Sequence, residues 1–196
     1  MTYDVKPMPF DPNAIKGLSP KLLTSHYDNN YTGAVKRLNA IEAQLKTLDW
    51  PTAPNFTING LKREELVAMN SMSLHEIYFA GLGAGGDPAG TLAQAIERDF
   101  GSIAAWRAEF AAMGKAMGGG SGWVLLNYMP RDKRLVNSWA SDHTNIPANA
   151  RPLLALDMYE HAYHMDYGAK AGAYVDAFMA VIDWKNAAAF YAQAAA

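Results

Sequence analysis

Apolar residues spaced alternately three and four positions apart constrain the early part of this 196-residue chain more than any other feature. The spacing places them on one face of an α-helix. The helix has a clear start, because Ser19 is a good N-cap residue and Pro20 suits the first helical position. Trp50-Pro51 predicts its end. The pattern therefore predicts a long helix from about residue 20 to residue 50 with one apolar face, formed by Tyr27, Tyr31, Ala34, Leu38, Ile41, Leu45 and Leu48.

A second helix is predicted at about 61–79, after a loop at 51–60, and these two helices form a hairpin. The glycine-rich stretch 81–86 is not a phosphate-binding loop, because no strand precedes it and no GK[ST] follows. Further helices are predicted at 87–100, 102–117, 170–182 and from 184 onward, and strands at 123–129, 135–140 and 152–156. We predict an α+β protein with an all-helical domain at 1–86 and a domain at 87–196 that contains a small three-stranded antiparallel sheet. A site between the two halves is expected.

Composition limits the classes of function. Half of the residues are hydrophobic and 18% are charged, which supports a globular core. The net charge of -2 gives no reason to expect nucleic acid or an anionic membrane as a partner. The chain has no cysteine, so only His, Asp and Glu remain for metal binding. The first residues lack a signal-peptide pattern and no segment is apolar enough to span a membrane, so we expect a cytoplasmic protein.

Asp157 and His161 stand four residues apart directly after the last predicted strand, and His164 follows three residues later. Side chains four apart on a helix can reach one point, and both residue types bind transition metals. His26 and His75 lie on the two long apolar helices. An isolated pair such as Asp157 and His161 is also typical of an exposed polar helix face, and a lone histidine on an apolar face is more often structural. Together, three imidazoles and one carboxylate would suit iron, manganese or zinc.

Five stretches resemble the iron/manganese superoxide dismutase family, over almost the whole chain. They are PMPF at 7–10, similar to PxLPY; HYD at 26–28, which begins the helix of the first ligand; HEIYF at 75–79, similar to the end of NHxxFW; GSGWVLL at 120–126, similar to GSGWxWL; and PLLALDMYEHAYH at 152–164, similar to PLLxxDVWEHAYY. The last match is highly specific. The resemblance implies the α+β fold of that family and its superoxide dismutase activity.

The resemblance also implies which residues act. His26, His75, Asp157 and His161 match the family's metal ligands, for one iron or manganese ion per subunit, with iron slightly favoured. One superoxide reduces the metal and leaves as dioxygen; the next oxidises it and leaves as hydrogen peroxide. The family forms homodimers or homotetramers, and Glu160 is expected at the subunit interface.

The sequence departs from the family where a glutamine usually hydrogen-bonds the metal-bound solvent. Ser71 stands at one of the two positions used for this glutamine and is too short to reach. The other position falls on His143, whose imidazole is expected to donate the hydrogen bond; Asp142 is the alternative if the alignment slips by one. Trp123 is retained, and Tyr159 replaces a tryptophan, so the aromatic walls of the metal site are expected to persist.

A second group of departures lies on the first helix. Asn30 replaces a histidine and Ala34 replaces the tyrosine that gates substrate access in the family. Tyr31, one turn from Ala34, either supplies a phenol from a different position or simply packs in the helix face. His164 replaces a tyrosine that meets the missing histidine across the dimer. We predict that Asn30 and His164 hydrogen-bond instead.

Three functions fit these residues. The first is an active superoxide dismutase with altered residues around the metal. The second is a metal-binding family member whose dismutation is weak or lost, and the missing gating tyrosine is the feature that favours it. The third, a hydrolytic zinc enzyme, lacks an obvious general base. The choice between iron and manganese stays open.

Overall fold

The computed structural model describes residues 2–196. The helices are α1 (Pro20–Ser25), α2 (Thr32–Thr47), α3 (Asn55–Ala80), α4 (Gly90–Phe100), α5 (Ile103–Ala116), α6 (His164–Tyr167), α7 (Ala171–Ala180) and α8 (Trp184–Ala195). Short 3-10 helices cover Pro12–Ala14 and Glu160–Ala162, and His26–Tyr31 is a π-helix between α1 and α2. The strands are β1 (Trp123–Met129), β2 (Arg134–Ala140) and β3 (Arg151–Asp157). The predicted fold class, helices first and then helices with a three-stranded antiparallel sheet, is confirmed.

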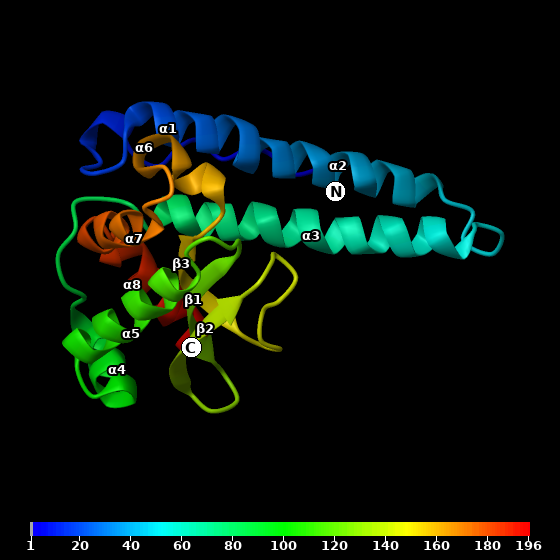
Figure 1. Cartoon of the computed structure of the whole chain (residues 1–196). Coiled ribbons are helices and arrows are strands. Elements are labelled where there is room, and N and C mark those ends of the chain that lie inside the picture. The colour runs from blue at the N-terminus through cyan, green and yellow to red at the C-terminus, as the bar shows by residue number, and fades with distance from the viewer. Residues whose placement is uncertain (1) are drawn as a thin grey trace.

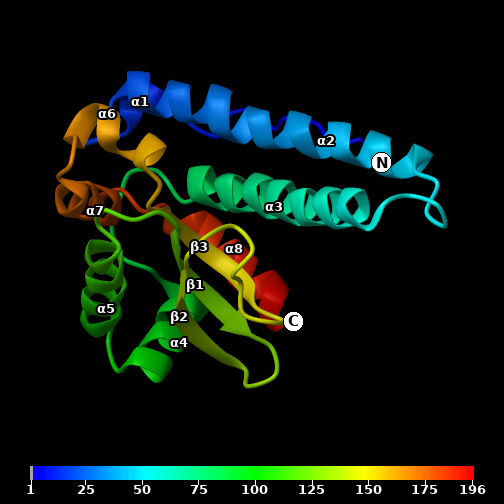
Figure 2. The ribbon, with the colours of Figure 1, turned by 45° about the vertical axis from the view of Figure 1, so that its right-hand side comes forward.

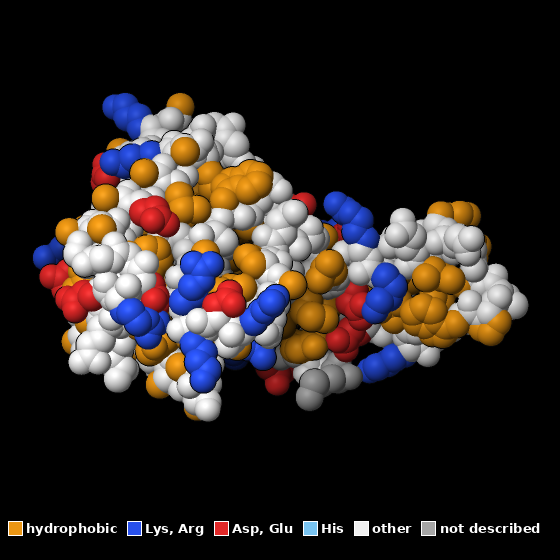
Figure 3. Space-filling model, turned by 90° about the horizontal axis from the view of Figure 1, so that it is seen from below, with side chains coloured by type: hydrophobic (Ala, Val, Ile, Leu, Met, Phe, Trp, Pro, Cys, Tyr) orange, Lys and Arg blue, Asp and Glu red, His pale blue; other side chains and the backbone are white. Residues whose placement is uncertain are grey.

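Helices α2 and α3 form a long antiparallel hairpin that lies above the rest of the molecule and extends well beyond it (Figures 1 and 2). The Ser19 hydroxyl accepts a hydrogen bond from Leu22 N at 3.1 Å, with Pro20 at the first helical position, so the predicted start is correct. Seen from below, the free end of the hairpin is an arm that carries surface hydrophobic side chains (Figure 3). Trp50 is 48% exposed and Phe56 is 80% exposed.

The sheet has the order β2-β1-β3, and both pairings are antiparallel. The register places Trp123, the first residue of β1, opposite Asp157, the last residue of β3. β1 is buried along almost its whole length, which explains why its sequence is nearly continuously apolar rather than alternating. Helix α4 contacts β2, α5 contacts β1 and β2, and α8 contacts β1 and β3. In Figure 2, α8 lies directly beneath α3. The sheet register therefore fixes two candidate site residues as neighbours.

Helix α3 connects the two halves of the molecule, because it contacts α2 on one side and β3 on the other. Its C-terminal half is buried, and includes Ala68, Met72, Leu74, Tyr78 and Phe79. The same hydrophobic core continues into the second half of the chain, where Trp106, Phe110 and Phe178 are fully buried. No helix within residues 2–196 is long and apolar enough to cross a membrane.

The structure corrects two helix boundaries. The first predicted helix is not continuous, since a π-helix separates α1 from α2, and it ends at Thr47 rather than near Trp50. The second begins at Asn55, six residues before the predicted start at 61, because Pro54 occupies the N-cap position and Gly60 is accommodated inside the helix.

Candidate metal centre

Four elements deliver the four predicted ligands. His26 is the first residue of the π-helix, and His75 lies on α3. Asp157 ends β3, and His161 lies in the 3-10 helix that follows it. Single π-helical turns often occur at functional sites, because the wider turn reorients side chains that a regular helix would place elsewhere. Residues separated by up to 135 positions, 161 less 26, thus meet at one point.

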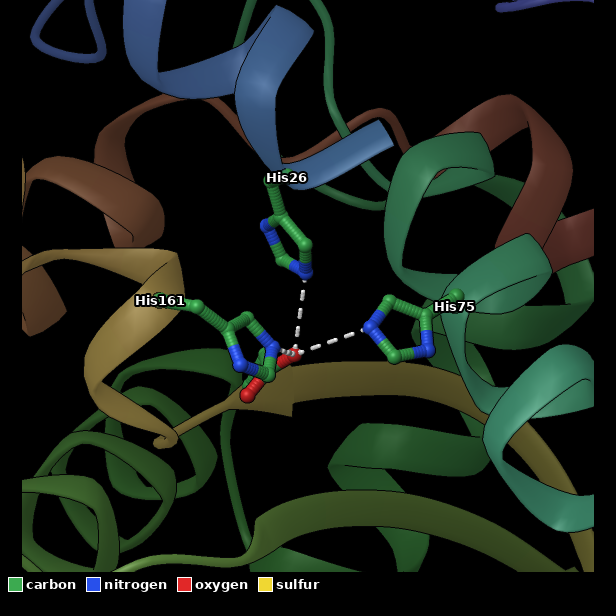
Figure 4. A group of neighbouring side chains, drawn as sticks. His26, His75 and His161 are labelled. Atoms are coloured by element: carbon green, nitrogen blue, oxygen red, sulfur yellow. Dashed lines mark hydrogen bonds and ion pairs between the residues drawn. The ribbon is translucent and has the colours of Figure 1, made fainter. Parts of the chain in front are cut away.

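The three imidazoles point toward one another from different sides (Figure 4). Each of the four residues offers one ligand atom, and these atoms all lie within 4.8 Å of one another. The distance from Asp157 Oδ2 to Nε2 is 3.2 Å for His26, 3.6 Å for His75 and 3.2 Å for His161. The structure therefore brings together all four residues that the sequence predicts as ligands, with three imidazole nitrogens and one carboxylate oxygen facing one point.

The histidine nitrogens lack the partners that buried polar atoms normally have. His26 Nε2 and His75 Nε2 have no hydrogen-bond partner within the described residues, although both side chains are only 1% exposed. Burial lowers the pKa of His26, and it lowers the pKa of His75 to about 3. Both rings are therefore neutral at pH 7, with unshared electron pairs directed at the cluster. This is the form in which histidine binds a metal, so the residues present fit a divalent or trivalent metal ion.

Other groups orient the ligands. The backbone carbonyl of Ser71 accepts a hydrogen bond from His75 Nδ1 at 2.7 Å, which leaves Nε2 unprotonated toward the cluster. Tyr159 N donates to Asp157 Oδ1 at 2.8 Å, so Oδ2 remains for the metal side. Burial alone would raise the pKa of Asp157, but the adjacent His161 and His26 hold it well below its usual range. The carboxylate is therefore ionised.

Aromatic rings surround the cluster. Trp123 is fully buried and meets His75 edge-on, with ring centroids 5.3 Å apart. Tyr159 stacks on His161 at 5.4 Å with an interplanar angle of 10°. The predicted aromatic walls are thus present at both positions.

A cavity of about 250 Å³ lies against the cluster and is lined by His75, His161 and His143. Ala34 and Ser71 also line it, together with Gly33 and Ala68. These side chains are small, so neither Ala34, at the position of the gating tyrosine, nor Ser71, at the helix position of the glutamine, is long enough to fill the cavity. The cavity gives a small molecule access to the centre.

His143 lies in the position expected for a residue that contacts the contents of the cavity. Its ring stacks on Tyr159 at 4.9 Å, and Trp123 Nε1 donates to its Nδ1 at 3.0 Å. Asp142, the alternative, is engaged elsewhere: its Oδ1 accepts hydrogen bonds from Thr144 N and Thr144 Oγ1 at 2.7 and 2.6 Å. The geometry favours His143.

Tyr31 does not line this cavity. Its hydroxyl accepts a hydrogen bond from Lys6 N at 2.9 Å and donates to Glu76 Oε1 at 3.1 Å, beside a separate cavity. This placement favours packing in the helix face, the second of the two expectations for Tyr31, over a phenol supplied to the metal site.

The residues predicted at a subunit interface are accessible. Glu160 and His164 are exposed, and Asn30 is partly exposed and lines the metal-site cavity. The predicted hydrogen bond between Asn30 and His164 joins two subunits, so it stays a prediction.

Two supporting residues were not anticipated from the sequence. Tyr174 on α7 donates its hydroxyl hydrogen to the backbone carbonyl of Asp157 at 2.7 Å. Asn70, directly before Ser71, donates to the His143 carbonyl at 2.6 Å. No sequence pattern predicts these two contacts, because each one joins segments that are distant in the sequence.

Comparisons with known proteins agree with this geometry. Residues 88–190 match the family described as iron/manganese superoxide dismutases, C-terminal domain. The chain belongs to the iron/manganese superoxide dismutase family. It is 66% identical, over 99% of its length and 98% of the relative's, to superoxide dismutase [Fe] of Cupriavidus metallidurans. It is 35% identical, over 99% of its length and 98% of the relative's, to superoxide dismutase [Mn] 2 of Haloferax volcanii. The family predicted from the sequence motifs is confirmed.

Proposed function

We propose that this chain, an enzyme of the superoxide dismutase family, disproportionates superoxide with one iron ion bound by His26, His75, Asp157 and His161. The observation that carries the proposal is the pair of buried, neutral imidazole nitrogens without hydrogen-bond partners, aimed with His161 at an ionised carboxylate. Such nitrogens would be costly to bury without a metal. Iron is preferred to manganese because a relative of 66% identity is named superoxide dismutase [Fe].

Iron would supply one-electron redox chemistry by alternating between its trivalent and divalent states. The chain's residues set the conditions for it. Asp157 contributes the only negative charge among the four ligands, so the loaded centre keeps an excess of positive charge that attracts a small anion. The buried Trp123 and the half-buried Tyr159 limit the water around the cluster. Ser71, through its carbonyl, keeps His75 in the tautomer that binds a metal.

Superoxide is small, and the cavity lined by Gly33, Ala34 and Ser71 offers it a route to His75 and His161. His143, on the same cavity, supplies a donor for the bound anion. This role replaces the glutamine that the family places near the metal. Nothing in the structure or in the relatives favours the alternative of a metal-binding protein without dismutase activity.

The activity is tested by measuring superoxide turnover per bound ion in protein from cells grown with added iron or with added manganese. Metal analysis of the same samples gives the occupancy. We expect turnover in proportion to bound iron. A fully iron-loaded protein no faster than free aqueous iron at the same concentration would refute the proposal.

The ligand set is tested separately by metal content. Replacing His75 with Ala removes one of four ligands and should lower affinity by more than roughly 100-fold, the upper end of the loss seen for residues that merely support a ligand. His164→Ala removes an exposed histidine and is the control, with loading expected to match the unchanged protein. Stoichiometric loading of the His75→Ala variant would show that the ligand assignment is incorrect.

We further propose a homodimer or homotetramer with Glu160 and His164 at the interface, supported by the exposure of both side chains. The domain boundary is proposed near Gly86, supported by the start of the C-terminal family match at residue 88. A cytoplasmic location stays a proposal.

A further inference from the structure

Ser19 and Asp166 join the two segments of the chain that carry His26 and His161. The carboxylate of Asp166 accepts two hydrogen bonds from Ser19, one from the backbone N at 2.6 Å and one from Oγ at 2.7 Å. The two residues are 147 positions apart in the sequence. Helix α6, which contains Asp166, accordingly lies next to α1 in both views of the ribbon (Figures 1 and 2). The contact therefore connects the two segments at a point outside the metal cluster.

Ser19 is connected to His26 by hydrogen bonds of the helix backbone. The Ser19 carbonyl accepts a hydrogen bond from Leu23 N at 3.0 Å, and His26 N donates to the Leu23 carbonyl. The backbone stays in the right-handed helical region through Ser25 and His26, so α1 continues without a break into the π-helix. The position of Ser19 therefore determines where the helix presents His26.

Asp166 is connected to His161 by two short turns. Tyr163 N donates to the Glu160 carbonyl at 3.1 Å, and this hydrogen bond closes the 3-10 helix that contains His161. Asp166 N donates to the Tyr163 carbonyl, also at 3.1 Å. Asp166 follows His161 by only five positions, 166 less 161. A movement of Asp166 is therefore transmitted to His161 through a short, hydrogen-bonded segment.

The two histidines on these segments face the same point (Figure 4). The Nε2 atoms of His26 and His161 each lie 3.2 Å from Asp157 Oδ2, and the two ring centroids are 4.7 Å apart. An ion that binds both rings must hold the two segments at one spacing, and ordering loosely held ligands costs conformational entropy when the ion binds. A contact that holds the segments together before the ion binds removes part of this cost.

Two neighbouring contacts support the same junction. The Ser19 hydroxyl, which donates to Asp166, also accepts from Leu22 N at 3.1 Å, so one side chain both caps α1 and binds α6. Tyr167 donates its hydroxyl hydrogen to the carbonyl of Gly17, which lies in the turn before Ser19. Asp166 and Tyr167 therefore hold the start of α1 from two adjacent positions.

We propose that Asp166 is a positioning residue that binds Ser19 and thereby holds His26 and His161 at the spacing that one metal ion requires. The proposal rests on the proposed ligand set, in which both histidines bind the ion. It concerns metal affinity and the arrangement of the ligands, so it is tested without measuring turnover of superoxide.

The test uses chelator-treated protein reconstituted with Co²⁺, whose visible absorption spectrum depends on the number and arrangement of its ligands. Competition with a chelator of known affinity gives the dissociation constant. Asp166→Ala removes both hydrogen bonds to Ser19. It should weaken Co²⁺ binding by about fivefold, the equilibrium effect of one hydrogen bond at an exposed site, and should alter the spectrum.

Asp166→Asn separates the contacts of Asp166 from its charge. The asparagine has no negative charge but keeps both contacts, because its amide oxygen can accept from Ser19 N and its amide nitrogen can donate to Ser19 Oγ. We expect this variant to bind Co²⁺ nearly as tightly as the unchanged protein and to give the same spectrum.

A second pair of variants separates positioning from general stability. Ser19 caps α1 through Leu22 N at 3.1 Å, and Ser102 caps α5 through Ala105 N at 3.0 Å. Ser19→Ala and Ser102→Ala each remove one helix cap, so the two variants should lose similar stability in urea denaturation. Only Ser19→Ala also removes a contact to Asp166, so only this variant should bind Co²⁺ more weakly than the unchanged protein.

The inference would be overturned if Asp166→Ala matched the unchanged protein in Co²⁺ affinity and spectrum. An Asp166→Asn variant as weak as Asp166→Ala would also overturn it, since loss of charge would then explain the effect. If Asp166→Ala does not fold, equal Co²⁺ affinities of Ser19→Ala and Ser102→Ala would overturn it instead. The ligand assignment is separate, because it fails only if His75→Ala still binds metal stoichiometrically.

Discussion

The metal-free protein should lose stability as the pH falls from about 6.5 to about 5, because the buried His75 and His26 cannot accept protons in the folded state. A free histidine has a pKa near 6.5, whereas burial lowers the pKa of His75 to about 3 and also lowers that of His26. In this range the unfolded chain binds more protons than the folded chain. Stability is therefore complete above about pH 6.5 and decreases as the pH falls toward the folded-state pKa.

The size of the effect follows from the two pKa values of His75. Each pH unit below about 6.5 costs about 1.4 kcal/mol for one proton, so His75 alone should cost about 2 kcal/mol at pH 5. His26 adds to this loss in the same direction. Asp157, whose pKa is lowered, contributes stability that is lost only below about pH 3.8, so its loss falls outside this window. A loss of 2 kcal/mol is a large part of the roughly 5–15 kcal/mol that stabilises most proteins.

The assay is urea denaturation of chelator-treated protein at several pH values between about 5 and 7.5. His75→Phe keeps an aromatic ring but removes the titrating group, so its plot of unfolding free energy against pH should be shallower by about 1.4 kcal/mol per unit below pH 6. Trp106→Phe changes a buried ring that does not titrate and serves as the control. It should lower stability equally at each pH and keep the slope of the unchanged protein.

The reasoning would be refuted if His75→Phe and the unchanged protein had the same slope between about pH 5 and 6.5. That result would mean that His75 takes up a proton in the folded state nearly as readily as in the unfolded one. The buried, unpartnered nitrogen would then not be the neutral ligand that the metal assignment requires.

Two other substitutions probe residues whose roles differ. Tyr31→Phe should lower the free energy of unfolding by about 1 kcal/mol, because it removes the hydroxyl that is hydrogen-bonded to Glu76. Turnover per bound iron should not change. A large loss of turnover would place Tyr31 in the catalytic centre. Gly122→Ala should cost roughly 3 kcal/mol or more in urea denaturation, because φ is 135° and the new Cβ would lie 2.1 Å from the Ala140 carbonyl oxygen. Gly119→Ala, at φ 84° with open space around it, is the control and should cost much less; equal costs would argue against the clash.

Capping preferences and hydrophobic patterns predicted those helices and strands whose start or end depends on only a few neighbouring residues. The capping of α1 by Ser19 and of α5 by Ser102 needs only the residues of one turn, and both caps are present. The strands followed in the same way from apolar runs bounded by glycine and proline. The sequence also nominated His26, His75, Asp157 and His161, because each lies in a motif that is recognisable without its neighbours in space.

Contacts between distant segments could not be obtained in this way. No local pattern predicts that His26 begins a π-helix, or that the Tyr31 hydroxyl donates a hydrogen bond to Glu76. The choice between Asp142 and His143 likewise depends on which side chain Trp123 can reach across the sheet.

For this protein, the sequence alone determined the fold class, the family and the four residues of the metal cluster, since these depend on local periodicity and on short motifs. The tertiary structure alone decided which ring nitrogen is free in His75 and in His143. Ser71 fixes that of His75 through a backbone carbonyl, and Trp123 fixes that of His143 through an indole. The position of a proton on a histidine depends on a partner within about 3 Å, and such a partner is known only once the chain has folded.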